Sequence, residues 1–168
     1  PSCTPSRATI MSGKWAYKNG FQNYELHISD PVGLPLKNKL MPEFMVELGY
    51  KTHMIGKWNI GHCNERYAQS SPSIYVDDFT KCFRALSDCL NRYLPTYRGF
   101  EKFLGYHGPG HGYYNYGVGS DQATRDMMEG KSKYDDKAGK FVDHSWKTGE
   151  SYLGTYDTEL YRIRTTTY

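Results

Sequence analysis

One stretch in the first third of the chain constrains the fold most: a helical pattern, a glycine and an alternating pattern follow one another directly. Residues 37–48 predict a helix with one apolar face. The apolar residues at helical spacing are Leu40, Met41, Phe44, Met45 and Leu48. Gly49 suits the left-handed position that ends a helix, and residues 50–55 then alternate as a strand does. A helix joined to a strand by so tight a turn is half of an α/β unit, so the stretch predicts an α/β fold.

The length and the charge of the chain exclude several function classes. Its 168 residues suffice for one hydrophobic core. The net charge of +3 is too small to indicate binding to nucleic acid or to a membrane surface. No apolar run is long enough for a membrane span. The four cysteines have neither the pattern of a disulfide framework nor the spacing of a zinc site: Cys3, Cys63, Cys82 and Cys89.

The first residues place a cysteine at the start of a predicted helix over residues 4–12. Pro5 fits the first helical turn, and Gly13 suits the helix end. Cys3 then faces free backbone N–H groups and the positive end of the helix dipole, which favour negative charge. Arg7 lies one turn further along the same face. These residues are the parts of a site that stabilises an oxyanion, although a buried cysteine beside a surface helix fits the stretch equally well.

A second candidate site follows the predicted strand. Ligands of open α/β sheets bind beyond the carboxyl ends of the strands, and Lys57 stands there between Gly56 and Trp58. A solvated lysine side chain is the alternative. Residues 105–119 are rich in Gly, His and Tyr and predict an irregular loop. We interpret this loop as a substrate-binding rim, in preference to a metal site that would lack a third ligand. The candidate residues of the rim are His107, His111 and Tyr113.

The last third of the chain gives less specific predictions. Residues 120–151 are polar and predict a solvated, mobile loop. Asp135 and Asp136, which lie within it, are interpreted as loop residues and not as metal ligands. Residues 162–168 have the pattern of a helix start.

Three motifs in order resemble those of the type I sulfatases, with the closest likeness to the arylsulfatase B group (N-acetylgalactosamine-4-sulfatase). The first is Cys-Thr-Pro-Ser-Arg, which runs from Cys3 to Arg7 and is followed by Gly13. The second is Gly-Lys-Trp-Asn-Ile-Gly over residues 56–61, which resembles the family's Gly-Lys-Trp-His-Leu-Gly. The third, over residues 94–106, resembles Pro-Thr-x-Arg-Gly-Phe followed by Phe-Gly-Tyr.

The resemblance implies a fold, a reaction and a set of site residues. The fold is a partial sulfatase or alkaline-phosphatase-like α/β sandwich, truncated at both ends. The reaction is hydrolysis of sulfate esters of glycans or aryl sulfates, with a formylglycine nucleophile that the formylglycine-generating enzyme makes from Cys3. Arg7 and Lys57 would bind and stabilise the sulfate charge, and Ca²⁺ would bind the nucleophile, which also makes Cys3 a metal ligand. Asn59 replaces the family's histidine and can hydrogen-bond but not titrate.

The resemblance also implies that residues 1–168 are an internal fragment of the N-terminal catalytic domain of a longer, lysosomal or secreted protein. Relative to the family, residues 68–93 are an insertion, either a real helix or extra coding sequence. Cys3 is the one family metal ligand in the chain, so we expect the fragment alone to be inactive. Two alternatives stay open: a phosphate or phosphonate ester hydrolase of the same superfamily, and a degenerate copy without turnover.

Overall fold

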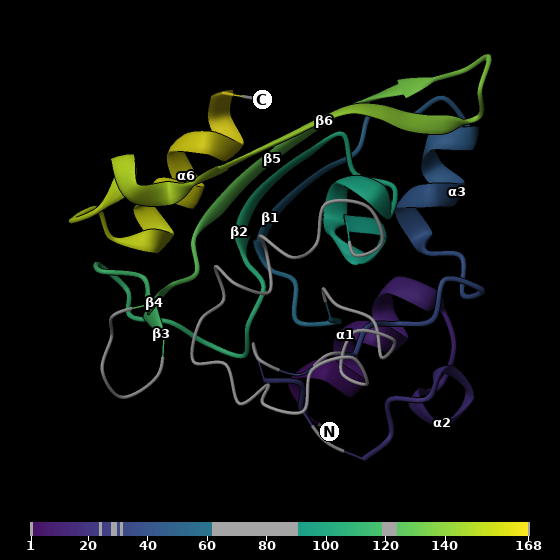
Figure 1. Cartoon of the computed structure of the whole chain (residues 1–168), viewed down its shortest axis with the longest axis horizontal. Coiled ribbons are helices and arrows are strands. Elements are labelled where there is room, and N and C mark those ends of the chain that lie inside the picture. Colours follow the sequence, from purple (N-terminus) through teal and green to yellow (C-terminus); the bar gives the residue numbers. More distant parts are fainter. Residues whose placement is uncertain are drawn as a thin grey trace, which may run out of the picture.

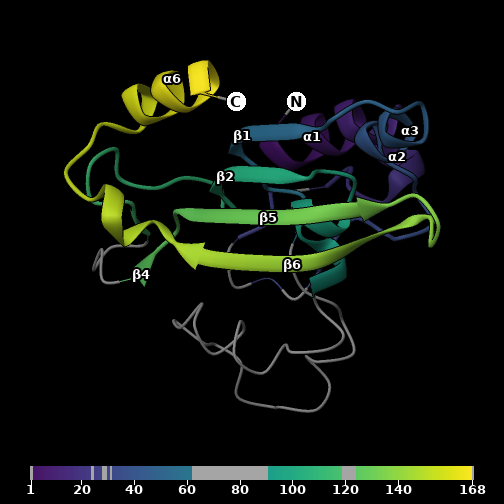
Figure 2. The same ribbon diagram turned by 90° about the horizontal axis from the view of Figure 1, so that it is seen from above.

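The computed structural model describes residues 2–23, 25–27, 30, 32–61, 91–118 and 124–167. Its centre is a four-stranded sheet in the order β1-β2-β5-β6 (Figures 1 and 2). β1 (His53–Lys57) pairs in parallel with β2 (Lys102–Tyr106). β5 (Met128–Asp135) and β6 (Lys140–Thr148) continue the sheet in antiparallel pairing. The parallel pair confirms the predicted α/β class, and the antiparallel hairpin makes the sheet a mixed one.

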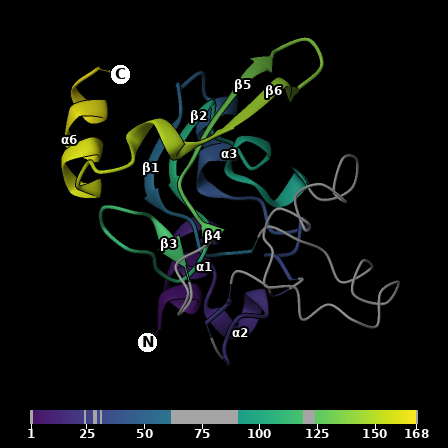
Figure 3. The same cartoon turned by 60° about the vertical axis from the view of Figure 1, so that its left-hand side comes forward.

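Helices lie on both faces of this sheet (Figure 3). α1 (Cys3–Ser12) and α2 (Ala16–Asn19) contact each other near the end where β1 finishes, and α3 (Met41–Glu47) precedes β1 (Figure 1). α6 (Asp157–Thr167) contacts β1 from the other side (Figure 3). The remaining short elements are η1 (Asn91–Tyr93), η2 (Pro95–Tyr97), η3 (Gly149–Tyr152) and the paired strands β3 (Gly117–Val118) and β4 (Thr124–Arg125).

Two clusters of buried apolar side chains hold these elements together. Phe103 belongs to the larger cluster, which joins α1, the segment before α3 and the central strands. Its neighbour Leu104 belongs to the smaller cluster, which reaches Leu160 on α6. Because successive residues of a strand point to opposite faces, β2 serves both clusters and fixes the position of α6 relative to α1.

The predicted helix over 37–48 exists but is shorter, and of its predicted apolar face only Leu40 is buried. The helix runs from Met41 to Glu47, and Gly49 ends it with a φ of 84°. Phe44 is 50% exposed and Leu48 is 73% exposed, whereas Pro42 and Val46 are buried. Two stripes with the same four-residue spacing run along this segment, and the structure buries the one that holds Pro42 and Val46.

The prediction of a mobile loop over 120–151 is also wrong for most of that range. β5 and β6 form a regular hairpin there, and Trp146 packs against Phe103 with ring centroids 5.9 Å apart. Because much of the hairpin is exposed, it needs few apolar residues, which explains why its polar composition misled the prediction. Asp135 lies at the hairpin turn, where its Oδ1 accepts hydrogen bonds from the backbone of Lys137 and Ala138.

Two predictions fall largely on residues that the structure does not describe. Residues 62–90 hold most of the predicted insertion over 68–93, together with Cys63, Cys82 and Cys89, and they lie outside the described residues. Of that insertion, the structure describes η1 (Asn91–Tyr93). Among the helices that the structure describes, none has both the length and the apolar character needed to cross a membrane.

The glycine of the Gly-Lys-Trp motif has a conformational role. Gly56 has a φ of 104°, a left-handed value that favours glycine, and it pairs with Gly105 on β2. A Cβ atom on Gly105 would lie 1.9 Å from the carbonyl oxygen of Gly56. The two glycines therefore let the parallel strands approach closely just before Lys57. This close approach fixes the position of Lys57 at the end of β1.

A buried carboxylate joins the hairpin to the C-terminal helix. Glu129 on β5 is buried, accepts a hydrogen bond from the Tyr152 hydroxyl at 2.6 Å and pairs with Lys147 at 2.8 Å. Arg164 on α6 approaches the same carboxylate at 3.9 Å. Burial opposes ionisation, but the hydrogen bonds from Lys147 and Tyr152 and the charges of Lys147 and Lys131 outweigh it and lower the pKa of Glu129 to about 2.

Acid is expected to weaken the fold through Glu129. Its pKa is lower in the folded than in the unfolded state, where it lies near 4.5. The folded state therefore binds fewer protons, and the stabilisation is present above pH 4.5 and lost as the pH falls toward 2. We expect the difference in free energy of unfolding between the wild type and Glu129→Gln to shrink by on the order of 3 kcal/mol between pH 7 and pH 2. Urea titrations across this range measure it, and a pH-independent difference would contradict the assignment.

Candidate active site

The candidate nucleophile lies at the first position of α1. Ser2 is the N-cap of this helix, Cys3 is its first residue and Gly13 ends it with a φ of 65°. The helix thus begins one residue before the predicted start and ends where predicted. Cys3 is partly exposed, and it is the free cysteine among the residues that the structure describes. A thiol at this position is accessible and faces the positive end of the helix dipole.

A carboxylate that the sequence did not reveal occupies this helix N-terminus. Glu25 Oε1 accepts hydrogen bonds from the Cys3 backbone N–H at 2.9 Å and from the Ser2 hydroxyl at 2.7 Å. These donors, with the Cys3 side chain and the charge of Lys57, lower the pKa of Glu25 to about 2. Glu25 lies in an irregular segment far along the chain from Cys3, so no spacing rule could have predicted the contact.

The two candidate cations meet at the end of β1. Arg7 Nη1 donates a hydrogen bond to the carbonyl oxygen of Lys57 at 2.6 Å, so the guanidinium lies against the last residue of the strand. Lys57 Nζ in turn donates to the carbonyl oxygen of Pro109 at 2.5 Å. The positive charge of Lys57 helps to lower the pKa of Glu25, and the Glu25 carboxylate accepts the hydrogen bond from the Cys3 backbone N–H. Cys3, Arg7 and Lys57, which come from two separate motifs, therefore gather at one corner of the fold.

Asn59 lies behind this corner and is buried. Its Oδ1 accepts a hydrogen bond from the Thr4 hydroxyl at 3.2 Å, and its Nδ2 donates to the carbonyl oxygen of Leu26 at 2.9 Å. Its φ of 49° is left-handed, a conformation in which asparagine is enriched. In this arrangement the Asn59 amide holds the residue next to Cys3, so it ties α1 to the segment that follows β1.

The three candidate rim residues have different surroundings. Tyr113 is exposed, whereas the side chains of His107 and His111 are almost completely buried. The His111 ring stacks on Tyr106 with centroids 4.0 Å apart, and its Nε2 lies 3.2 Å from Asp157 Oδ2. The sequence pattern predicted an irregular loop, and the structure has one between β2 and β3. The pattern did not indicate that the tyrosine is exposed while the two histidine side chains are buried.

His107 pairs with a second carboxylate that sequence reasoning missed. Asp126 is fully buried, and its two oxygens accept hydrogen bonds from the backbone N–H of His107 at 2.9 Å and of Gly108 at 2.6 Å. The His107 ring Nδ1 lies 3.5 Å from the same carboxylate. Burial alone would raise the pKa of Asp126, but these bonds and the charge of His107 hold it below its ordinary value. Asp126 thereby fixes the start of the rim loop directly after β2.

The residues described do not form a complete site for the divalent metal that the resemblance implies. Within the described part of the chain, no group of three or more His, Cys, Asp and Glu side chains could hold a metal ion. Ca²⁺ takes six to eight oxygen ligands. Glu25 beside Cys3 offers one carboxylate, and Asp126 and Asp157 are already engaged by His107 and His111.

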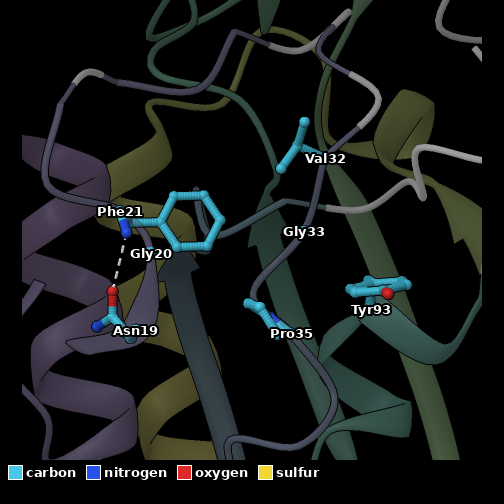
Figure 4. A pocket seen from close by; sticks show the side chains of 7 residues that line it. All are labelled: Asn19, Gly20, Phe21, Val32, Gly33, Pro35 and Tyr93. Carbon is cyan, nitrogen blue, oxygen red and sulfur yellow. Dashed lines mark hydrogen bonds between the residues drawn. The ribbon is translucent and has the colours of Figure 1, made fainter. Parts of the chain in front are cut away.

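A pocket of about 350 Å³ lies elsewhere, between the segment after α2 and the segment before α3 (Figure 4). Phe21, Val32 and Pro35 supply most of its apolar lining, and the Tyr93 ring closes one side. None of the candidate catalytic residues is among those that line it. We therefore place the candidate site at the corner formed by Cys3, Arg7 and Lys57, and not in this pocket.

Comparison with known proteins identifies the family to which this chain belongs. The family model of the sulfatases matches residues 1–142, which include α1, β1, β2 and β5. The chain therefore belongs to the sulfatase family, and the resemblance inferred from the three motifs is confirmed.

Individual relatives to which the chain is similar include arylsulfatases and other sulfatases. Arylsulfatase J of Mus musculus is 33% identical over 105 residues, which cover 62% of this chain and 13% of the relative. N-acetylgalactosamine-6-sulfatase of Homo sapiens is 33% identical over 69 residues, which cover 37% of this chain and 13% of the relative. The uncharacterized sulfatase YdeN of Escherichia coli is 32% identical over 113 residues, which cover 66% of this chain and 19% of the relative. The chain thus spans less than a fifth of the length of these relatives.

A solved structure confirms the fold. Ps i-CgsB, determined in complex with k-i-k-neocarrahexaose, superposes with a TM-score of 0.59 at 20% sequence identity. The match covers 98% of this chain and 30% of that protein. At this level of identity the likeness concerns the fold alone, and it confirms the prediction of a partial sulfatase-type α/β fold.

Proposed function

We propose that this chain is the nucleophile-bearing part of a sulfuric ester hydrolase that acts on sulfate esters of glycans or aryl sulfates. The observation that carries the proposal is the position of Cys3 at the first turn of α1, in a corner that also holds Arg7 and Lys57. The family membership supports the reaction class. The named substrates of its relatives, N-acetylgalactosamine-6-sulfate esters among them, support a sulfated glycan as the substrate.

We propose that Cys3 functions after conversion to formylglycine. The hydrated aldehyde supplies one hydroxyl that attacks sulfur while the alcohol leaves, and a second hydroxyl whose deprotonation expels sulfate and restores the aldehyde. Such covalent catalysis divides one difficult step into two easier ones. A thiol has no second oxygen on the same carbon, so an unconverted Cys3 lacks the second step.

The other residues of the corner are proposed to bind charge and to hold the geometry. Arg7 presents a planar fork and Lys57 a compact charge, and both suit the sulfate oxygens on which negative charge accumulates. Asn59 is proposed to position Cys3 through Thr4 and not to transfer a proton, because an amide does not titrate. Tyr113 is proposed to contact the substrate. His107 and His111 are proposed to support substrate binding by holding the rim loop in place through their pairs with Asp126 and Asp157.

Ca²⁺ is proposed as the cofactor from the family alone. Cys3 is the one family ligand in the chain, and the described residues around it do not complete a shell. We therefore propose that turnover needs more of the sulfatase domain than these 168 residues, and that the chain by itself binds Ca²⁺ poorly. We likewise propose the formylglycine-generating enzyme as a partner and a lysosomal or secreted location, both by family likeness.

Relative rates on two ester classes test the proposed reaction. The full-length protein, co-expressed with a formylglycine-generating enzyme, is assayed on p-nitrophenyl sulfate and on p-nitrophenyl phosphate. We expect the sulfate ester to be hydrolysed faster. A faster rate on the phosphate would establish the phosphate ester hydrolase instead, and no turnover of either ester would indicate a degenerate copy.

Removing the charge of Glu25 is expected to strengthen the binding of sulfate esters. In Glu25→Gln the side-chain oxygen can still accept the hydrogen bond from the Cys3 N–H, but the negative charge at the helix N-terminus is gone. An anionic ester approaching Cys3 then meets less repulsion, so we expect KM to fall about threefold or more with a smaller change in kcat. Steady-state kinetics of the full-length protein measure it, with Glu47→Gln on the exposed end of α3 as the control. An increase in KM would show that the Glu25 charge assists binding.

A further inference from the structure

A cluster of exposed tyrosines on the rim loop and just before α6 extends beyond Tyr113, the one member already proposed to contact substrate. Tyr113 is 62% exposed, Tyr114 is 59% exposed and Tyr156 is 41% exposed. The ring centroid of Tyr156 lies 5.8 Å from that of Tyr113 and 5.4 Å from that of Tyr114. The three rings, which come from two segments far apart in the sequence, therefore form one continuous surface, which we call the tyrosine platform.

The backbone beneath the tyrosine platform is fixed. The carbonyl oxygen of Tyr113 accepts a hydrogen bond from the Asp157 N–H at 3.0 Å, and that of Tyr114 accepts one from the Gly154 N–H at 3.0 Å. Both bonds join the rim loop to the segment that carries Tyr156. The backbone that carries the three rings is thus held in one arrangement before any ligand arrives, which reduces the backbone entropy lost on binding.

The same loop is also tied to the fold from below. The Tyr116 ring is buried, and its hydroxyl donates to the carbonyl oxygens of Tyr152 and Thr155 at 2.8 and 2.7 Å. At the other end of the loop, the Pro109 carbonyl oxygen accepts the hydrogen bond from Lys57 Nζ. One rigid loop therefore connects the tyrosine platform to the corner that holds Lys57 and Arg7.

The chemistry of the tyrosine platform favours a sugar over other ligands. Tyrosine combines a flat apolar ring with a polar hydroxyl at its edge. A pyranose ring has the matching character, because one face presents C–H groups and its rim presents hydroxyls. Exposed apolar patches mark binding sites, but three hydroxyls within the patch disfavour a purely apolar partner such as an acyl chain. Because the plane of Tyr156 is turned by 66° from that of Tyr113 and by 32° from that of Tyr114, the surface matches a carbohydrate ring that lies on the face of one tyrosine and meets its neighbours at the edge.

We propose that the tyrosine platform binds a pyranose ring of a glycan substrate, at a subsite apart from the sulfate-binding corner of Cys3, Arg7 and Lys57. The proposal rests on the proposed function in that the glycan would be the one whose sulfate ester reaches Cys3. It adds Tyr114 and Tyr156 to the site, and it predicts that affinity depends on sugars beyond the sulfated one.

Glycan binding without turnover tests the proposal. The full-length protein carrying Cys3→Ala is titrated with a chondroitin 4-sulfate hexasaccharide by isothermal calorimetry. We expect a Tyr113→Ala/Tyr156→Ala variant to bind the hexasaccharide at least about tenfold more weakly, because two aromatic contacts are lost. The matched control is Tyr50→Ala, since Tyr50 is also 62% exposed but lies before β1.

A second variant keeps the test decisive if the alanine variants fold poorly. Tyr113→Phe/Tyr156→Phe keeps both rings and removes their hydroxyls, so we expect its affinity to stay within about threefold of the parent. Equal affinity of the double alanine variant and the parent, or an equal loss in Tyr50→Ala, would overturn the proposal. Binding that depends on the tyrosines in a protein that hydrolyses no sulfate ester would support the tyrosine platform while contradicting the proposed reaction.

Discussion

In the full-length protein, replacing Cys3 by Ala is expected to reduce sulfate ester hydrolysis by at least about 10³-fold, because the variant has no precursor of the nucleophile. Cys3→Ser is expected to fail as well. A serine hydroxyl can attack sulfur once, but its carbon carries no second oxygen to expel the sulfate. Turnover by p-nitrophenyl sulfate assay measures both losses.

The control for these variants lies on the same helix. Ile10 is exposed on α1 and lies outside the Cys-Thr-Pro-Ser-Arg segment, so Ile10→Ala tests a change in the helix that leaves the modification motif intact. We expect its activity to stay within about twofold of the wild type, as is usual for surface substitutions. Activity above about a tenth of the wild-type level in Cys3→Ala would show that another residue is the nucleophile.

Replacing Arg98 by Ala is expected to destabilise the fold by about 2–6 kcal/mol, because each of two buried acceptors left without a donor costs about 1–3 kcal/mol. The Arg98 guanidinium is buried and donates hydrogen bonds to the carbonyl oxygens of Leu34 at 2.9 Å and Asn38 at 2.7 Å. Glu43 on α3 lies 3.7 Å away. The variant leaves these buried acceptors without their donor and detaches η2 from the segment that leads into α3.

Arg92→Ala is the matched control, because Arg92 lies in the neighbouring η1 turn and is exposed. We expect this control to change the free energy of unfolding by less than about 0.5 kcal/mol. Urea denaturation of both variants, followed by circular dichroism, measures the two values. Equal stability of the Arg98 and Arg92 variants would contradict a structural role for the third sulfatase motif.

The sequence could place the candidate residues Cys3, Arg7 and Lys57 because each lies within a local pattern. The predicted helix over 4–12 puts Arg7 one turn beyond Cys3, and the predicted strand over 50–55 puts Lys57 just past its end, although the observed strand runs from His53 to Lys57 itself. The contacts between elements could not be predicted this way. Glu25 reaches Cys3 from an irregular segment, and Asp126 reaches His107 from beyond β3, so no spacing rule connects either pair.

The errors in the predicted fold have a common physical cause: the sequence pattern does not show which surface of an element is covered by the rest of the protein. On α3, two stripes of equal spacing compete, and the one with Pro42 and Val46 faces the core. In the hairpin of β5 and β6, exposed strands keep a polar composition that resembles that of a loop. For the same reason, the exposure of Tyr113 and the burial of His107 became apparent only in the folded chain.

Mass spectrometry of the peptide that contains Cys3, taken from the full-length protein expressed with a working formylglycine-generating enzyme, tests whether Cys3 becomes the nucleophile. We expect a peptide about 18 Da lighter than the cysteine form, the change from thiol to aldehyde. An unmodified thiol, in a preparation where a control sulfatase peptide is converted, would contradict the assignment of Cys3 as the nucleophile.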